Sequence, residues 1–137
     1  MITKDEIDIL LTEESRRAVE DNLNRDPSAV AMNKHLANAR LISTQVKYLQ
    51  RARTKLPSYY AARCIIAPLA FEQSSAEAVA DMRQYSGKLA VDLTCGLGMD
   101  AYALSKKFDT VIAVENNPVL AYLAKVNFAL LGANNIQ

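Results

Sequence analysis

The pattern of apolar and polar positions at the start of the chain is that of short α-helices. Thr3 and Glu6 have the spacing of a capping box, which predicts that a first helix begins there. Thr12 is placed to cap a second helix running towards Leu23, because a threonine hydroxyl can accept a hydrogen bond from a free N–H of the first turn. We therefore expect two short helices before residue 24.

A third helical segment is expected to begin at Asp26 and Pro27, an aspartate cap followed by a proline in the first turn. It is predicted to reach about Lys55, either continuously or with a break near Asn33, and to end before Pro57. Apolar residues recur three and four positions apart along its second part and form a core-facing side: Ala39, Ile42, Val46 and Leu49. The opposite side is basic, with Arg40, Lys47, Arg51 and Lys55.

The region that follows is less regular. Residues 58–73 show no periodicity that assigns an element. Ser74 and Glu77 have the spacing of another capping box, which predicts a helix through about Tyr85.

From residue 88 onward, strands alternate with helices. The expected elements are a strand at 88–93, a turn at 96–98, a helix at 100–107, a strand at 110–115 and a helix at 117–131. Because both strands are apolar throughout, we expect a parallel sheet covered on both faces. The predicted fold class is α/β: a helical N-terminal domain (residues 1–70), then the first βαβα part of a Rossmann-like fold with an incomplete parallel sheet (residues 71–137).

Composition limits the class of protein. The chain has 137 residues, half of them hydrophobic and 23% charged, which is typical of a globular protein rather than a disordered one. No apolar run approaches the roughly 20 residues needed to span a membrane, and no signal peptide is recognisable. The two cysteines belong to no metal-binding pattern. We expect a cytoplasmic protein with no membrane contact and no metal site.

The net charge of +1 is unevenly distributed. Residues 27–71 contain seven bases and no acid. A basic stretch of this kind indicates an anionic partner, and the four bases along the third helical segment could follow an RNA backbone. A merely solvated helix face is the alternative, and the two differ in how steeply binding falls with salt.

The strongest chemical signal combines Asp92, the pair Gly96 and Gly98, and Glu115. The glycines let the backbone turn tightly from strand to helix and let a ligand lie against it. Glu115 follows at the predicted end of the second strand, where a carboxylate can accept the hydroxyl hydrogens of a ribose. A glycine pair alone is also compatible with a tight turn, but the combination predicts a nucleotide site.

Two cofactors are compatible with these glycines. Gly96, Gly98 and Ala101 satisfy the dinucleotide fingerprint, which would indicate an NAD-binding oxidoreductase domain. Against this, several residues separate the strand from the first glycine, and a carboxylate at Asp92 would repel a pyrophosphate. S-adenosylmethionine has no phosphate, and its amino group and sulfonium are positive, which suits Asp92.

The stretch from Leu89 to Gln137 resembles class I S-adenosylmethionine-dependent methyltransferases, most closely RNA-modifying members such as the trimethylguanosine synthase type and the RNA uridine C5-methyltransferases. The motifs that carry the resemblance are Asp92-x-Thr94-Cys95-Gly96-x-Gly98, Val111-Ile112-Ala113-Val114-Glu115-x-Asn117-Pro118, Lys125-x-Asn127, and Gly132 with Asn135-Ile136. Two earlier segments resemble uncharacterised bacterial methyltransferases with a helical N-terminal domain and a THUMP-like C-terminal region: Lys55-Leu56-Pro57-Ser58-Tyr59 and Glu72-Gln73-Ser74-Ser75-x-Glu77-x-x-Ala80.

This resemblance implies S-adenosylmethionine as cofactor. The cofactor-binding residues that it implies are Asp92, Thr94, Cys95, Gly96, Gly98, Glu115 and Asn116. Asp92 and the two glycines would line the methionine part, and Glu115 would hold the ribose. Three further residues would close over the methionine end, or would only cap a helix: Ser74, Ser75 and Glu77.

The family's acceptor-side motifs follow its third and fourth strands and have no counterpart before Gln137, so no catalytic residue is assigned. We interpret the chain as the N-terminal part of a methyltransferase that acts on an RNA base when complete and is inactive as this part alone. Both edges of its two-stranded sheet would be bare, so self-association through strands or helices is expected. The alternatives are the oxidoreductase domain above and a non-enzymatic helical module that binds RNA or a partner.

Overall fold

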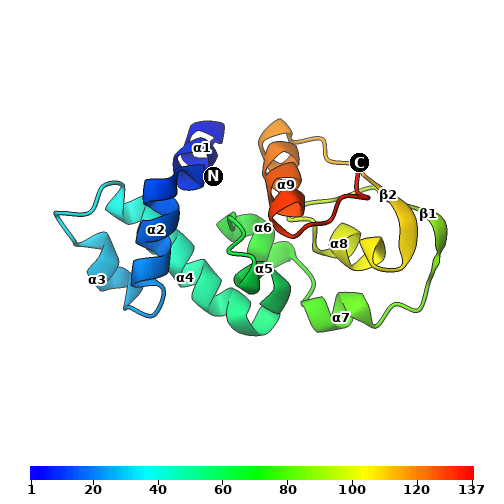
Figure 1. Ribbon diagram of the computed structural model, residues 1–137, viewed down its shortest axis with the longest axis horizontal. Coiled ribbons are helices and arrows are strands. Elements are labelled where there is room, and N and C mark those ends of the chain that lie inside the picture. Colours follow the sequence, from blue (N-terminus) through cyan, green and yellow to red (C-terminus); the bar gives the residue numbers. More distant parts are fainter.

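Helices make up the N-terminal part of the computed structural model, which describes residues 1–137 (Figure 1). Their bounds are α1 (Lys4–Leu11), α2 (Glu13–Asn22), α3 (Pro27–Ala31), α4 (Ala39–Lys55), α5 (Pro57–Ala61), α6 (Pro68–Gln73) and α7 (Glu77–Asp81). The capping box predicted for α1 is present, because Thr3 and Glu6 each accept a hydrogen bond from the other's backbone N–H. The hydroxyl of Thr12 caps α2 as predicted.

The third predicted segment is two helices, α3 and α4, and the chain between them is not helical. Asn38 precedes α4 in the left-handed conformation, with φ of 56°, which breaks a continuous helix. The helices α5 and α6 occupy much of the stretch that the sequence left unassigned. Each begins at a proline, a residue that lacks only an N–H that a helix start leaves free in any case.

The capping box predicted at Ser74 and Glu77 is wrong. Ser74 ends α6, and α7 begins after Ala76 with no side-chain cap. The helix ends at Asp81 instead of near Tyr85. The Oε2 of Glu77 instead accepts a hydrogen bond of 3.0 Å from the backbone N–H of Ser58.

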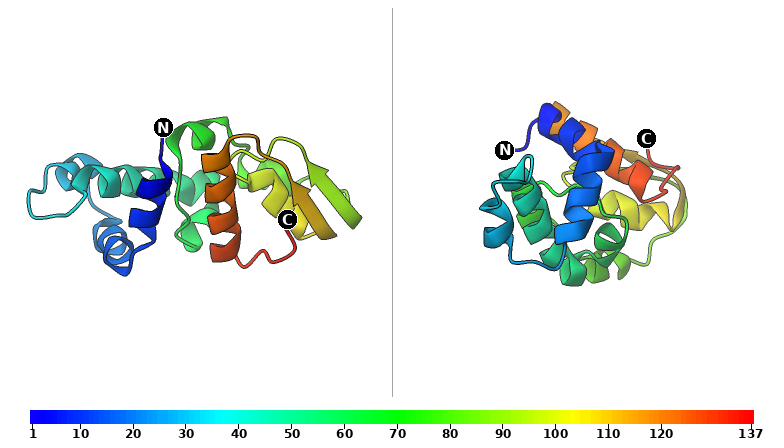
Figure 2. Two further views of the ribbon diagram at one scale, coloured as in Figure 1. Left: turned by 90° about the horizontal axis from the view of Figure 1, so that it is seen from above. Right: turned by 60° about the vertical axis from the view of Figure 1, so that its left-hand side comes forward.

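The C-terminal part is a parallel two-stranded sheet with two helices, at one end of the elongated molecule (Figures 1 and 2). The elements are β1 (Gly87–Asp92), α8 (Met99–Ser105), β2 (Phe108–Ala113) and α9 (Pro118–Leu130). The strand register pairs Ala90 with Val111 and Asp92 with Ala113. The order of elements is the predicted βαβα, but β2 begins and ends two residues earlier than expected, so Glu115 lies beyond the strand.

Only one face of this sheet is covered. A buried cluster of Cys95, Ala101, Val111, Ala124 and Phe128 joins the sheet to α8 and α9. On the other face, five large apolar side chains are exposed: Leu89, Val91, Leu93, Ile112 and Val114. The prediction of a sheet covered on both faces is therefore wrong for this chain. None of the helices combines the length and the apolar composition that spanning a bilayer requires.

The edges of the sheet also differ from expectation. The outer edge of β2 is paired, because the N–H of Val111 donates to the carbonyl of Asn135 and the N–H of Gln137 donates to the carbonyl of Val111. These bonds run parallel to β2, so residues 135–137 extend the sheet on that side. The expectation that both edges are bare is thus wrong for β2.

One hydrophobic core joins the two parts of the chain. Its 23 buried residues run from Ile2 to Leu123 and include residues on both sides of position 70. Through its centre passes a short extended segment whose backbone groups are held by side-chain amides. Gln45 of α4 hydrogen bonds to both the N–H and the carbonyl of Ile66, and Asn127 of α9 does the same to Ile65. The predicted boundary near residue 70 therefore crosses a shared core.

Candidate cofactor site

The loop between β1 and α8 is fixed by its backbone. The N–H of Val114 donates to the carbonyl of Asp92 over 2.7 Å, and the N–H of Cys95 donates to the carbonyl of Val114 over 2.9 Å. A turn follows, in which the N–H of Gly98 donates to the carbonyl of Cys95. These bonds hold the loop against the end of β2. The hydroxyl of buried Tyr59 also fixes the loop, because it donates a hydrogen bond to the carbonyl of Leu97.

Asp92 has one satisfied and one free carboxylate oxygen. Its Oδ1 accepts a hydrogen bond of 3.1 Å from the N–H of Thr94. Its Oδ2 is buried and has no hydrogen-bond partner. Burial raises the pKa of this carboxyl, and the nearby charge of Asp100 reinforces the effect, whereas the backbone N–H groups of Thr94 and Ala101 and the charge of Arg83 oppose it. The negative charge of Asp92 therefore favours a positively charged group close to the loop.

Glu115 joins the glycine loop to the start of α9. Its Oε2 accepts a hydrogen bond of 2.9 Å from the N–H of Gly96, and its Oε1 accepts one of 2.9 Å from the N–H of Asn117. Each carboxylate oxygen can accept a second hydrogen bond, so the pair remains able to receive two ribose hydroxyls. The position beyond the strand end leaves the carboxylate at the edge of the loop.

The two glycines have different surroundings. Gly96 has φ of +54°, and a Cβ added to it would meet nothing within 4 Å. Gly98 has φ of +95°, and a Cβ there would lie 2.7 Å from the ring of Phe128 and 3.2 Å from the hydroxyl of Tyr59. Gly96 therefore leaves space beside the loop, whereas Gly98 allows α8 to pack against α9 and α5.

A cavity of about 1400 Å³ opens at this loop. Of the cofactor-binding residues predicted from the sequence, it is lined by Ser74, Ser75, Thr94, Cys95, Gly96 and Glu115. The others do not line it: Glu77, Asp92, Gly98 and Asn116. The structure thus brings the end of α6, the glycine loop and the end of β2 to one cavity.

Glu77 lies behind the cavity wall. Its side chain is 5% exposed, and its Oε1 has no hydrogen-bond partner. Ser74 donates to the carbonyl of Ser75, so neither residue caps α7. Asn116 is exposed.

Cys95 is a packed thiol at the floor of the loop. Burial, reinforced by the charges of Asp92 and Glu115, raises its pKa to about 12. It is therefore protonated and poorly nucleophilic at neutral pH. No group of three or more His, Cys, Asp or Glu side chains is arranged to hold a metal ion.

Two of the four basic side chains predicted for one face of α4 make contacts within the molecule. Arg51 forms a two-bond ion pair with Glu72, which lies one residue past the acid-free stretch. The Nζ of Lys55 donates to the backbone carbonyl of Phe71. Lys47 is exposed, and Arg40 belongs to the cavity wall. The four bases do not therefore form one uniform stripe.

Sequence reasoning missed several residues of the cavity. Leu97, Met99 and Asp100 follow the glycine loop, and Leu120 comes from α9. Asp100 could have been suspected, because an acid in the first turn after a glycine loop lies beside any ligand held there. Oδ1 of Asp100 is also 3.1 Å from the guanidinium of Arg83.

Comparison with known proteins supports the fold. No protein-family model matches the chain, and no curated protein matches it. Among solved structures, it is similar to the crystal structure of a "putative methyltransferase from Porphyromonas gingivalis W83", with a TM-score of 0.78 and 26% sequence identity. The match covers 100% of this chain and 35% of that chain. The chain has a methyltransferase-like α/β fold, which confirms the predicted fold class at this level.

Proposed function

We propose that the chain provides the cofactor-binding part of a class I S-adenosylmethionine-dependent methyltransferase. The observation that carries the proposal is Glu115, which lines the cavity and holds the glycine loop through the N–H of Gly96. Asp92 lies behind the cavity lining, so its negative charge would attract the positive methionine part of the cofactor without direct contact. Glu115 would accept the ribose hydroxyls, and the open side of Gly96 would admit the ligand against the backbone.

The chemistry proposed for the bound cofactor is donation of its sulfonium methyl group. The chain's own residues bind and orient it, so their contribution is alignment of donor and acceptor rather than proton transfer. We assign no catalytic residue within the chain. The similar solved protein, of which the chain spans 35%, supports this proposal because it is itself described as a "putative methyltransferase".

The dinucleotide alternative is disfavoured by the same carboxylate. A pyrophosphate at the glycine loop would approach Asp92, Asp100 and Glu115, and like charges repel strongly where water is partly excluded. NAD is therefore the comparison ligand for the test below.

For the complete protein, we propose an RNA base as the methyl acceptor. Support comes from the seven bases and no acid of residues 27–71, together with the resemblance to RNA-modifying enzymes. Some of these bases form neither an ion pair with Glu72 nor a hydrogen bond to a backbone carbonyl, among them Lys34, Arg40 and Lys47. A phosphate backbone is the partner that such unpaired cations favour.

The test is calorimetric titration of S-adenosylhomocysteine and of NAD into the chain, with the variants Asp92→Asn and Asp109→Asn. We expect the first ligand to bind and NAD not to bind. Asp92→Asn should weaken binding by about tenfold, because it removes a negative charge close to the positive methionine part of the ligand. Asp109→Asn removes an exposed acid on β2 outside the cavity and should leave the affinity unchanged.

The same titration has a pH dependence of known sign. Since burial raises the pKa of Asp92 above its ordinary 3.8, protonation removes its charge at a higher pH than for a free carboxyl. Affinity should therefore fall as the pH is lowered through that raised pKa, and Asp92→Asn should lose this dependence. Binding of NAD alone, or equal effects of the two variants, would contradict the proposal.

A further inference from the structure

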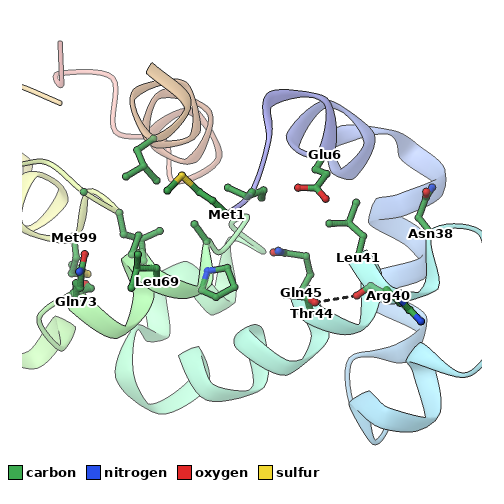
Figure 3. Close-up of a pocket in the computed structure, with 18 of the residues that line it drawn as sticks. Met1, Glu6, Asn38, Arg40, Leu41, Thr44, Gln45, Leu69, Gln73 and Met99 are labelled. Carbon is green, nitrogen blue, oxygen red and sulfur yellow. Dashed lines mark hydrogen bonds between the residues drawn. The ribbon is translucent and has the colours of Figure 1, made fainter. Parts of the chain in front are cut away.

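The cavity at the glycine loop continues far beyond the residues that would hold the cofactor. It passes α6 and reaches the start of α1 and the first turns of α4, in the helical part of the chain. Figure 3 shows this continuation, with Met99 and Gln73 near one end and Asn38 near the other. Met1 and Leu69 lie between the two ends (Figure 3). We call the part bounded by α1, α4 and the chain between α3 and α4 the helical chamber.

The size of the cavity exceeds the need of one ligand. Sites for one small ligand or cofactor usually measure about 300–1,000 Å³. The whole cavity measures about 1400 Å³. Since its lining joins the glycine loop to the helical chamber without interruption, a second molecule bound there would lie next to the cofactor.

The walls of the helical chamber combine apolar side chains with a similar share of polar ones. Leu41 of α4 points towards Glu6 of α1 across the chamber (Figure 3). Asn38 makes no side-chain hydrogen bond, so its amide can both donate and accept. The Thr44 hydroxyl donates to the carbonyl of Arg40 over 3.0 Å and can still accept. Such a lining suits a flat, partly apolar group that has both donors and acceptors.

The charge at the chamber is suited to an anion. Lys34 and Arg40 both belong to its lining. The one carboxylate there, Glu6, accepts the N–H of Thr3 and keeps its negative charge, so two cations outweigh one anion in the chamber. A base that enters the chamber would thus bring its phosphates towards two cations, and a neutral or cationic acceptor would gain nothing from them.

We propose that the helical chamber is the acceptor site, in which a single nucleotide of RNA inserts its base between α1 and α4. This inference rests on the proposed function, because it places the acceptor beside the cofactor. The N-terminal helices would then form one wall of the active site. Leu41, Thr44 and Asn38 would contact the base, and Lys34 and Arg40 would contact the phosphates.

The experiment fills the chamber and leaves the glycine loop intact. Thr44→Trp puts an indole into the helical chamber, and Thr54→Trp makes the same change on the same helix at an exposed position outside the cavity. Each chain is first titrated with S-adenosylhomocysteine. A pool of fluorescein-labelled single-stranded RNA of random sequence is then added to each saturated chain, and binding is followed by anisotropy. Circular dichroism melts verify folding.

We expect all three chains to bind S-adenosylhomocysteine within about twofold of one another, and Thr44→Trp alone to lose about tenfold or more in RNA affinity. If Thr44→Trp instead impairs S-adenosylhomocysteine binding, the chamber belongs to the cofactor and the inference fails. It also fails if the wild type binds the cofactor analogue but not RNA, or if both tryptophan variants bind RNA as the wild type does. If the wild type binds neither ligand, the proposed function fails first.

Should Thr44→Trp not fold, the double variant Lys34→Ala with Arg40→Ala is used in its place. It must weaken RNA binding, and unchanged binding would overturn the inference.

Discussion

At the scale of single residues, the carboxylates of Asp92 and Glu115 differ in their hydrogen-bond partners. Both oxygens of Glu115 already accept backbone N–H groups, whereas Asp92 keeps one buried oxygen without a partner. The spacing around the glycines singled out both residues as candidates. It could not reveal that Glu115 also fixes the loop, because that depends on the backbone N–H groups of Gly96 and Asn117 pointing towards one carboxylate.

The two glycines of the loop are expected to respond differently to the same substitution. Gly98→Ala would force a Cβ against Phe128 at a positive φ, at a cost of about 2–5 kcal/mol in free energy of unfolding. Gly96→Ala meets no neighbour and should cost only the left-handed strain, about 1–2 kcal/mol. Urea denaturation of the two variants measures the difference. Equal losses would show that the space beside Gly96 is not open.

At the scale of elements, the extended segment between α5 and α6 depends on two amide side chains. Asn127→Ala would leave the N–H and the carbonyl of Ile65 buried without partners, at a cost of about 2–5 kcal/mol. Lys125→Ala, at an exposed position of the same helix, should change the free energy of unfolding by no more than about 0.5 kcal/mol. Thermal or urea unfolding compares the two. If Asn127→Ala were as stable as Lys125→Ala, water would have to replace the amide.

Helix starts were predictable from the sequence wherever a cap was local. Thr3, Thr12 and Asp26 each cap the helix expected of them, and Asn117 caps the helix expected at 117–131. The short helices α5 and α6 were missed although Pro57 and Pro68 stand at their first positions. Helices this short have too few turns to show a 3.6-residue periodicity, so proline was their only local signal.

The second strand illustrates the opposite case. Its apolar run made it recognisable, but its bounds and the exposure of Ile112 and Val114 depend on partners elsewhere in the chain. The apolar sequence of a strand indicates that both faces of its sheet can be buried. It does not indicate which residues bury them.

At the scale of the whole molecule, the bare apolar face of the sheet is expected to drive association. Large exposed apolar patches mark contact surfaces. We expect the apparent mass of the chain to rise with concentration in sedimentation velocity, and Val91→Lys to suppress that rise. Gln84→Lys adds the same charge in the exposed loop before β1 and should have little effect. A monomer at every concentration would contradict this expectation.

The sequence pattern predicts helices first and alternating strands and helices from residue 88 onward, which is the order of elements in the structure. It could not describe their packing, because Gln45 and Asn127 reach the same central segment from opposite parts of the sequence. Contacts between residues so far apart leave no periodic trace in a single sequence.

The shared core has a consequence for how such a chain can change over evolution. A domain with its own hydrophobic core can be exchanged between genes, because recombination at its boundary leaves the core of each resulting protein intact. Here a crossover near residue 70 would separate Asn127 from Ile65 and cut through the apolar cluster that both sides complete. The N-terminal helices and the βαβα elements are therefore expected to be inherited together and to diverge as one unit.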